Sequence, residues 1–443
     1  MNPSIPTRHL EVENRPTSLL VPYANNARTH PEKQIRKIAD SLRTYGWTLP
    51  LLRDALDNVI AGHARLTAAK LLGLTEIPTI RLEGLTEQQK RAYILADNRL
   101  AEASAWDDDL LAIEFQGLIE GGFDIELTGF EMSDVDRVLG CTEDATEEEP
   151  VALPDPDVPI VSHAGDLWRI GHHSIYCGDA REAESYERLL GNDRAAMVFA
   201  DGPYNLRIQG HVSGLGNVAH REFGMASGEM CPAEFTSFQR TVMKQLNAFS
   251  VDGSIHYQCI DWRHMSEMLD AAKGVYSELK NLCIWNKTNA GMGAFYRSKH
   301  ELIFVFKSGR STHINNFGLG DKGRHRSNVW DYPGVNTFRR GRMTDLESHP
   351  TCKPIALVAD AILDCSRRGD IVLDPFCGSG TTLLAAARSG RHGAAIEIDP
   401  VYVDLAVRRL EKATGKLAVH ADGDTFAHKA SIRAAKEDLD VQG

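Results

Sequence analysis

The sequence lacks the features that would place a protein in a membrane or outside the cell. It has no run of eighteen apolar residues, and its first residues, "MNPSIPTRHLEVENR", contain no apolar signal core. The eight cysteines are scattered singly and none stands in a C-x-x-C pair, so neither a zinc site nor a disulfide framework is indicated. We therefore expect no metal, no membrane span and a location in the reducing cytoplasm.

The sequence also lacks an excess of positive charge. Its formal net charge is −12, which argues mildly against a nucleic-acid partner, although binding depends on local patches more than on the total. Residues 310–344 form one such patch, with seven basic residues against two acidic ones. By itself this segment fits a solvated basic loop as well as a DNA contact.

A segment poor in apolar residues divides the chain. Residues 142–157, "TEDATEEEPVALPDPD", hold seven acids, three prolines and no base. Such a segment cannot bury enough apolar surface to fold, so we predict an extended linker. The predicted organisation is an N-terminal domain at 1–141, a linker at 142–159, a larger domain at 160–413 and a polar, poorly ordered tail at 414–443.

The hydrophobic pattern of the N-terminal domain predicts a small α+β fold. Three segments have helical periodicity: "HPEKQIRKIADSLRTYG" (30–46), "RLTAAKLLG" (65–73) and "TEQQKRAYILADNRL" (86–100). "LPLLRDALDNVIAGH" (49–63) is typical of a strand pair with its turn at Asp57–Asn58, and "EIPTIRL" (76–82) is typical of a strand.

The larger domain alternates strands with helices. Strands are predicted at 195–200, 254–259, 281–287 and 300–308, followed by a β-α-β unit at 370–376, 380–389 and 393–399. This alternation predicts an α/β fold with a doubly wound, mostly parallel sheet.

The β-α-β unit contains a glycine-rich turn, "DPFCGSGTT", between its first strand and its helix. Gly378 lies 19 residues before Glu397, the acid that ends the next strand, and this spacing suits a nucleoside whose ribose diol binds the acid. The pattern is F-x-G-x-G without a following lysine, so a phosphate-cradling loop is not expected. Helix–strand packing alone is the alternative.

A second strand end, "VFADGPYNL" (198–206), places an acid, a Gly-Pro pair and an aromatic side by side. A tight Asp-Gly turn is one explanation. The other is a pocket for a flat ring that bears an amino group. In that pocket the Asp201 carboxylate and the Gly202 carbonyl accept the two N–H bonds, and Tyr204 stacks on the ring.

These segments resemble a known family. "DPFCGSGTT" with "IEIDP" is similar to the S-adenosylmethionine-binding motif of amino-group DNA methyltransferases, "DGPY" to their catalytic D-P-P-Y, and "HPTCKP" (349–354) to their H-P-T-x-K-P element. The order, catalytic motif first, resembles the permuted β group. The resemblance covers about 160–412. It implies a Rossmann-like methyltransferase fold in permuted order, double-stranded DNA as substrate, a possible homodimer and S-adenosylmethionine as cofactor.

The resemblance assigns roles to residues. The catalytic motif is Asp201, Gly202, Pro203 and Tyr204, acting on a base flipped out of the duplex. The family has proline where this chain has Gly202, so reduced activity is possible, and Asp201 favours adenine over cytosine. The expected cofactor residues are Asp374, Phe376, Gly378, Gly380, Thr381, Glu397, Lys353, His349 and Asp179. Lys353 and His349 are expected near the methionine end, although Lys353 could instead be a surface lysine.

Target recognition is expected in the basic segment at 309–348, where the family keeps its recognition region. The predicted phosphate contacts are Arg324, Arg326, Arg339, Arg340 and Arg342. "NVWDYPG" (328–334) resembles a structural element of the family and is assigned to packing.

The N-terminal domain resembles the ParB/sulfiredoxin type over about 15–130, through "VIAGHARLTAAKLLGLTEIPTI" and "ILADNRLAE". Fusions of this type to methyltransferases are familiar in bacteria, phages and prophages. Gly62, His63 and Arg65 lie where a turn enters a helix and could bind an anion. Alternatively, Arg65 pairs with an acid and His63 only caps the turn.

Three functions remain open at this level. The first is a site-specific DNA adenine methyltransferase, with or without a partner restriction nuclease. The second is a partition-type DNA-binding regulator with a degenerate methyltransferase body. The third keeps the chemistry but acts on cytosine N4 or on RNA. We expect the first.

Overall fold

The structure is a computed structural model of the chain and describes residues 10–102, 106–139, 158–206, 226, 228–288, 295–317, 325–334 and 353–441. It divides into two compact units, residues 1–139 and 140–443. Most of the predicted linker lies outside the described residues. None of the helices in the described ranges is both long enough and apolar enough to cross a bilayer.

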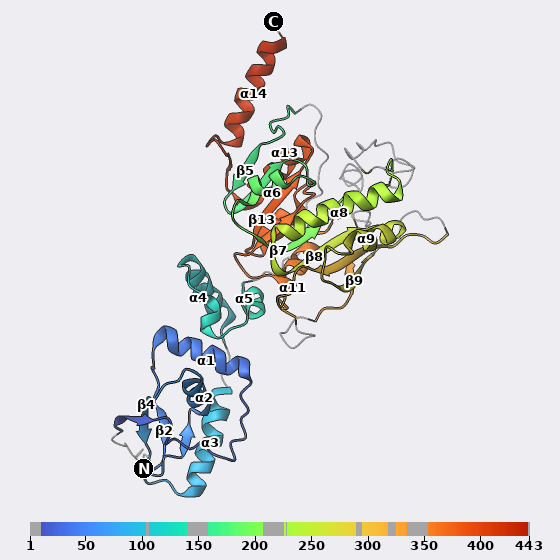
Figure 1. Cartoon of the computed structure of the whole chain (residues 1–443). Coiled ribbons are helices and arrows are strands. Elements are labelled where there is room, and N and C mark those ends of the chain that lie inside the picture. The colour runs from blue at the N-terminus through green and yellow to red at the C-terminus, as the bar shows by residue number, and fades with distance from the viewer. Residues whose placement is uncertain are drawn as a thin grey trace. The chain divides into compact units, whose positions relative to one another are not determined.

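The first unit has a four-stranded sheet in the order β1-β4-β2-β3. Figure 1 labels two of these strands, β4 and β2, and the helices near them. The strands are β1 (Val12–Pro16), β2 (Leu51–Arg53), β3 (Val59–Ala61) and β4 (Glu76–Arg81). The helices around it are α1 (Glu32–Tyr45), α2 (His63–Leu71) and α3 (Glu87–Glu102). Leu51, Leu66 and Ile77 pack between sheet and helices. The predicted small α+β fold is confirmed, including the turn at Asp57, whose φ is 63°.

A helical subdomain that the sequence analysis did not predict follows α3. It consists of α4 (Asp108–Glu120), a 3₁₀ turn η1 (Ile125–Thr128) and α5 (Met132–Val138), packed around Leu111, Phe115 and Val135. Start signals were present, because the Asp107 and Asp124 side chains each accept backbone N–H bonds at the first turn.

The described residues of the second unit form a ten-stranded sheet in the order β11-β9-β10-β8-β7-β12-β13-β6-β5-β14. The five central strands run parallel: β8 (Ser250–Ile260), β7 (Ala195–Ala200), β12 (Ile371–Asp374), β13 (His392–Glu397) and β6 (His173–Cys177). β7 comes before β12 in the chain and pairs with it in the sheet. This arrangement is the permuted α/β fold expected from the motif order.

Both flanks of the sheet contain antiparallel pairs. On one side β10 (His300–Lys307) pairs with β8 and with β9 (Glu278–Lys287), and β11 (Val329–Tyr332) lies parallel to β9. On the other side β5 (Leu167–Ile170) joins β6, and β14 (Ala418–His420) joins β5. Because β14 lies beyond residue 414, the expectation of a poorly ordered tail needs correction there.

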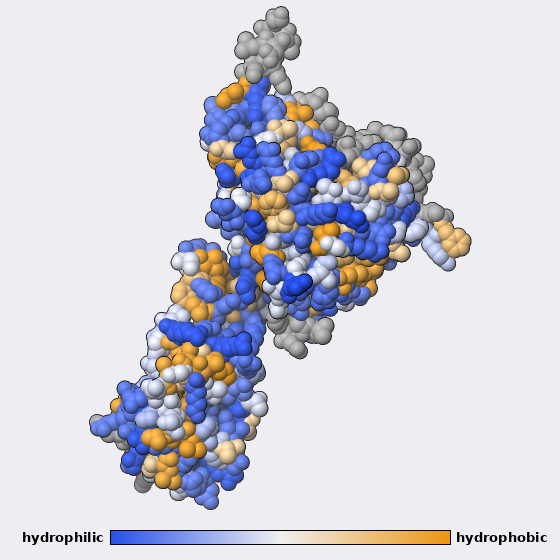
Figure 2. Space-filling model, in the orientation of Figure 1, coloured by the Kyte–Doolittle hydropathy of each residue, from blue (hydrophilic) through white to orange (hydrophobic). Residues whose placement is uncertain are grey.

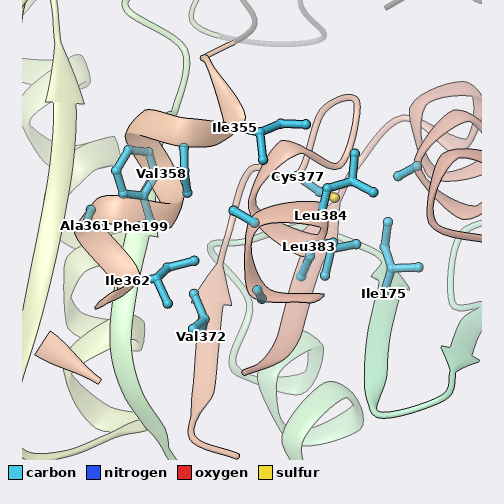
Figure 3. Packing of buried hydrophobic residues seen from close by; sticks show 14 of the residues in the cluster. Ile175, Phe199, Ile355, Val358, Ala361, Ile362, Val372, Cys377, Leu383 and Leu384 are labelled. Atoms are coloured by element: carbon cyan, nitrogen blue, oxygen red, sulfur yellow. The ribbon is translucent and has the colours of Figure 1, made fainter. Parts of the chain in front are cut away.

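Helices cover both faces of this sheet. One face packs against α6 (Ala183–Leu190), α8 (Pro232–Ala248) and α9 (Met265–Ala272), which follows the 3₁₀ turn η2 (Trp262–His264). The other packs against α11 (Ile355–Cys365), α12 (Thr381–Arg388) and α13 (Pro400–Thr414), with Phe426 from α14 (Phe426–Val441). Figure 3 shows Phe199 of β7 beside Val358 and Ala361 of α11. Adjacent β7 residues Val198 and Phe199 point to opposite cores, as strand alternation requires.

Candidate active site

The predicted site residues meet at one edge of the large sheet. Because β7, β12 and β13 are parallel neighbours, their carboxyl ends bring Asp201, Asp374 and Glu397 to the same edge. β10 runs antiparallel to β8, so its first residues, including Glu301, lie at this edge too. Figure 2 shows hydrophilic and hydrophobic residues mixed over the visible surface, so surface composition alone does not mark the site.

A partly buried group of charged and phenolic side chains, which we call the charged cluster, consists of Asp201, Tyr204, Lys287, Glu301 and Lys353. Lys353 is 5% exposed, and its Nζ donates to Asp201 Oδ1 at 2.6 Å and to Tyr204 Oη at 3.0 Å. It also lies 2.9 Å from Glu301 Oε2, and Lys287 forms an ion pair with Glu301 Oε1. The Tyr204 hydroxyl is 2.8 Å from Asp201 Oδ1 and 3.0 Å from Glu301 Oε2.

The charges of this cluster balance. Burial opposes ionisation of Glu301, but Lys353 and Lys287 outweigh it and lower the Glu301 pKa to about 2. Burial raises the pKa of Asp201, while Lys353 opposes this effect and Glu301 adds to it. Burial would lower the pKa of Lys353, but Asp201 and Glu301 raise it above its ordinary value. With all four groups ionised, two carboxylates face two ammonium groups.

The charged cluster determines which carboxylate oxygen of Asp201 can accept a hydrogen bond from a ligand. Within the described residues, the hydrogen bonds of its carboxylate involve Oδ1, which leaves Oδ2 as an acceptor for a bound amine. The following loop is held by Asn205, whose Oδ1 accepts from the backbone N–H groups of Gly228 and Met230. The arrangement can therefore offer a fixed, negatively charged acceptor at the end of β7.

The glycine at position 202 is explained by its close contact with Phe376, in the loop that follows β12. A Cβ at Gly202 would lie 2.7 Å from Cε2 and 2.9 Å from Cδ2 of Phe376. The glycine therefore lets the Phe376 ring lie against the backbone of the Asp201 loop. A proline here, as in the family motif, would require the ring to shift.

The glycine turn and its flanking acids form a second group, the carboxylate pair, Asp374 and Glu397. The Gly378 N–H donates to Glu397 Oε2 at 2.7 Å, and the Asp399 N–H donates to Oε1 at 2.9 Å. Asp374 Oδ1 accepts from the Phe376 N–H at 2.9 Å. Burial raises the pKa of each carboxyl to about 7, because these hydrogen bonds only partly offset the lost hydration.

The turn has the conformation that its glycines predict. Gly378 and Gly380 have φ values of 48° and 87°, and Gly380 is the residue just before α12, which begins at Thr381. A Cβ at Gly380 would lie 3.0 Å from the Ala406 Cβ, so the glycine also allows α12 and α13 to pack closely.

Asp179 also follows a parallel strand, β6, and so reaches the same edge. Its carboxylate binds Arg181, with Nη2 at 2.6 Å from Oδ2. Burial opposes ionisation of Asp179, but the Arg181 hydrogen bond prevails and lowers its pKa. The adjacent Gly178 N–H donates to the Glu397 carbonyl at 2.9 Å, which ties this loop to the carboxylate pair.

Lys353 differs from one of its two expected positions. Its side chain is buried, so the surface-lysine alternative is wrong. It contacts Asp201, Tyr204 and Glu301, and its place near the methionine end of the cofactor stays a prediction. His349 lies outside the described residues. Glu301 and Lys287 were missed by the sequence analysis, although "NKTNAGMGAFYRSKHELIF" does place charges beside two apolar strands.

Arg326 is a correction to the predicted DNA contacts. Its Nε donates to Asp364 Oδ2 at 2.9 Å, its Nη1 lies 3.2 Å from Asp360 Oδ2, and its guanidinium stacks over Trp330. It precedes β11, which is parallel to β9, and so lies at the opposite edge from Asp201. Its charge is used inside the protein. Arg324, Arg339, Arg340 and Arg342 lie outside the described residues.

The packing role predicted for residues 328–334 agrees with the structure, in which Trp330 is 4% exposed on β11.

In the N-terminal unit, Gly62 has a φ of 97° and precedes α2, which His63 begins. The Tyr23 N–H donates to His63 Nε2 at 3.3 Å, and Arg65 donates to the Leu49 carbonyl. Burial lowers the pKa of Arg65, and Asp97 opposes this effect. The three predicted residues thus share a helix start, and their binding of an anion stays a prediction.

Two segments of the chain match known protein families. A family model described as "DNA methylase" matches residues 195–408, and one described as "ParB-methyltransferase HTH domain" matches residues 109–164, which include the α4–α5 subdomain.

Two proteins of Escherichia coli match parts of the chain. The ParB-like nuclease domain-containing protein YnaK is 44% identical over 82 residues, which cover 18% of this chain and 94% of that protein. The DNA adenine methyltransferase YhdJ is 49% identical over 87 residues, which cover 20% of this chain and only 28% of YhdJ.

Solved structures resemble the chain at low identity. The M1.HpyAVI–SAM complex has 20% identity and a TM-score of 0.39, covering 53% of this chain and 98% of that chain. PvuII DNA methyltransferase (cytosine-N4-specific) has 16% identity and a TM-score of 0.40, covering 55% and 90%. C-terminally truncated ParB from Caulobacter crescentus, complexed with CTP-gamma-S, has 19% identity and a TM-score of 0.23, covering 29% and 71%.

Proposed function

The chain belongs to the DNA methylases of the N6/N4 class, with a ParB-like domain ahead of the methylase domain, and from this premise we propose that it methylates the N6 amino group of adenine in double-stranded DNA. The observation that carries the proposal is the Asp201 carboxylate, held at one oxygen by Lys353 and Tyr204 at the end of β7. The cofactor in this proposal is S-adenosylmethionine.

The chemistry requires this kind of site. An aromatic amine is a poor nucleophile because its lone pair is delocalised into the ring. Acceptance of its two N–H bonds by Asp201 Oδ2 and the Gly202 carbonyl would localise the lone pair and favour tetrahedral nitrogen. The N–C bond would form as the bond between the methyl group and the sulfonium sulfur breaks, which leaves a neutral thioether. Positive charge would grow on the nitrogen, the ionised Asp201 would stabilise it, and the surplus amine proton would pass to solvent. The base must first leave the duplex, since its amino group is out of reach of such a site while the base is stacked and paired.

The carboxylate pair suits the nucleoside end of the cofactor. Two ionised oxygens offer about four acceptor positions, and Glu397 uses one on each oxygen for backbone N–H groups. Two ribose hydroxyls could therefore donate to the rest. Both acids are buried with pKa values near 7, so a ligand that donates hydrogen bonds would stabilise their ionised forms. The cofactor supplies an electrophilic methyl group, and the chain's residues orient it toward the amine.

Adenine is the finer part of the proposal. Asp201 begins the catalytic motif, and the resemblance links aspartate there with adenine and serine more often with cytosine. The E. coli relative named DNA adenine methyltransferase supports this choice over the matched segment. Recognition by residues 309–348 and a homodimer also remain predictions.

The test is methyl transfer from labelled S-adenosylmethionine to unmethylated genomic DNA, followed by nucleoside analysis, with Asp201→Ala as the matched control. We expect label in N6-methyladenine with the wild type and none with the variant. Label in 4-methylcytosine would overturn the adenine assignment. Cofactor binding without any transfer would favour the regulator hypothesis and direct attention to Gly202.

A further inference from the structure

Two aromatic side chains stand almost fully in solvent close to the charged cluster. Phe295 is 89% exposed and Tyr296 is 81% exposed, more than any other large hydrophobic side chain among the described residues. Their rings meet edge to face, with centroids 4.7 Å apart. Exposed aromatic side chains of this kind usually mark a contact with a partner, because water solvates them poorly.

The sheet places this pair at the edge where the predicted chemistry occurs. β9 and β10 form an antiparallel pair, and the Lys287 N–H donates to the Lys299 carbonyl at 2.8 Å where the connection leaves the sheet. Lys287 and Glu301, on either side of the connection, both belong to the charged cluster. Tyr296 is five residues from Glu301, so it lies within about 20 Å of that residue even if the chain between them is fully extended.

The positive charge beside the two rings indicates which class of partner they contact. Arg297 and Lys299 are exposed next to the aromatic pair, and residues 288–300 contain no acid. Flat apolar rings flanked by cations match the stacked bases and phosphates of a nucleic acid. The rest of the chain has a net negative charge, so this local positive balance differs from the average surface.

We propose that Phe295 and Tyr296 insert into the DNA base stack next to the target base when that base leaves the duplex. The proposal rests on the proposed function, because it takes duplex DNA as the substrate. Extrusion of a base costs a few kcal/mol of stacking and pairing. An aromatic side chain that stacks on the remaining bases would recover part of that cost, while Arg297 and Lys299 contact the flanking phosphates.

The experiment compares duplex and heat-denatured genomic DNA as methyl acceptors for the wild type and for the double variant Phe295→Ala/Tyr296→Ala. We expect the duplex rate to fall about 5- to 150-fold, the range for loss of one stacked ring. The rate on single strands should stay within about twofold of wild type, because those bases are already unpaired. Tyr296→Phe, which keeps the ring, should resemble the wild type.

Leu279→Ala is the matched control, since Leu279 is 46% exposed at the opposite end of β9. It should alter neither rate. Equal loss on both acceptors in the double variant, or no loss on the duplex, would overturn the proposal. So would a changed oligomeric state of the double variant in sedimentation, which would assign the rings to contact between copies of the chain.

Equilibrium binding separates this inference from the proposed function. We expect the double variant to bind a duplex with one unpaired base more weakly than the wild type does, and to bind single strands equally. If the wild type transferred no methyl group but the variant still lost duplex binding, only the methylation proposal would fail. If the wild type transferred methyl groups, and the double variant matched it in both duplex binding and transfer, only the insertion proposal would fail.

Discussion

The charged cluster and the carboxylate pair lie at the same sheet edge, yet Glu301 of the cluster and the two acids of the pair have pKa values shifted in opposite directions. Glu301 has two lysines beside it, and its pKa falls to about 2. Asp374 and Glu397 have backbone and hydroxyl donors as their main stabilising partners, and burial raises their pKa values to about 7. Glu301 therefore keeps its negative charge at neutral pH without a ligand. The carboxylate pair becomes fully ionised at neutral pH only with further donors.

This difference corresponds to two tasks. A group that stabilises charge during a reaction should be ionised and oriented before the substrate arrives, since reorganisation would add to the barrier. A group that binds hydroxyls gains acceptor strength when the ligand's donors replace lost water. The comparison therefore predicts which changes affect transfer and which affect cofactor affinity.

The largest expected effect is on transfer, from Asp201→Ala. The variant loses the charged acceptor for the amine, so the rate should fall about a thousandfold, near the upper range for one electrostatic contact in an active site. Lys353 keeps Glu301 as a partner, so the fold should survive. Initial rates and calorimetric titration with S-adenosylmethionine measure the two quantities. A weakened cofactor affinity would contradict the division of tasks.

Glu301→Gln tests the charge balance of the cluster. The change leaves two ammonium groups facing one carboxylate, which disfavours positive charge on the amine, so kcat should fall about 10- to 100-fold with cofactor affinity unchanged. Steady-state kinetics at saturating cofactor measures this effect.

A second substitution serves as the control for Glu301. The double variant Lys287→Met/Glu301→Gln restores one carboxylate to one ammonium and should recover part of kcat. If the double variant is as slow as Glu301→Gln, the fall in kcat comes from altered packing in the charged cluster and not from its altered charge balance.

Glu397→Ala should act on the other group. It removes the acceptor for two ribose hydroxyls, and hydrogen bonds to charged groups contribute about 1.5–3 kcal/mol, so the cofactor Kd should rise about 10- to 100-fold. Because Asp201 and its partners are untouched, kcat at saturating cofactor should stay near wild type. Fluorescence or calorimetric titration gives Kd, and a fall in kcat without a change in Kd would reverse the assignment.

The smallest expected effect is the pH dependence of cofactor affinity. The acceptor form of Glu397 is the ionised one, and its pKa is about 7, so the fraction ionised rises as pH increases from 6 to 8. Cofactor affinity should increase about tenfold over this interval and level off above it. Glu397→Gln should show a weaker pH dependence. A cofactor affinity that increases as the pH falls would contradict the expected direction of this pH dependence.

Local patterns predicted most of the framework of both groups. Strand β7 was predicted with its observed bounds, because six apolar residues followed by Asp-Gly-Pro give a clear strand end. The glycine turn was predicted because Gly378 and Gly380 need backbone conformations that other residues rarely adopt. The α4–α5 subdomain and β14 were missed. α5 has only seven residues, and a three-residue strand shows no periodicity.

Contacts between distant segments were beyond these patterns. Glu301 is 97 residues from Tyr204 in the chain, and Lys353 is 152 residues from Asp201. The pairing of β10 with β8, next to β7, brings Glu301 to Tyr204. The packing of α11 against β7 brings Lys353, just before that helix, to Asp201. Arg326 was assigned to DNA by its local basic surroundings, and the direction of β11 places it at the far edge instead.

The sequence by itself determined the strands, the glycine turn and the acids at the strand ends, because these depend on residue order and backbone conformation over a few positions. The tertiary structure decided how those acids are charged. A carboxylate's pKa depends on burial and on ions within a few ångströms, and for Asp201 and Glu301 those ions come from Lys353 and Lys287 in other parts of the chain.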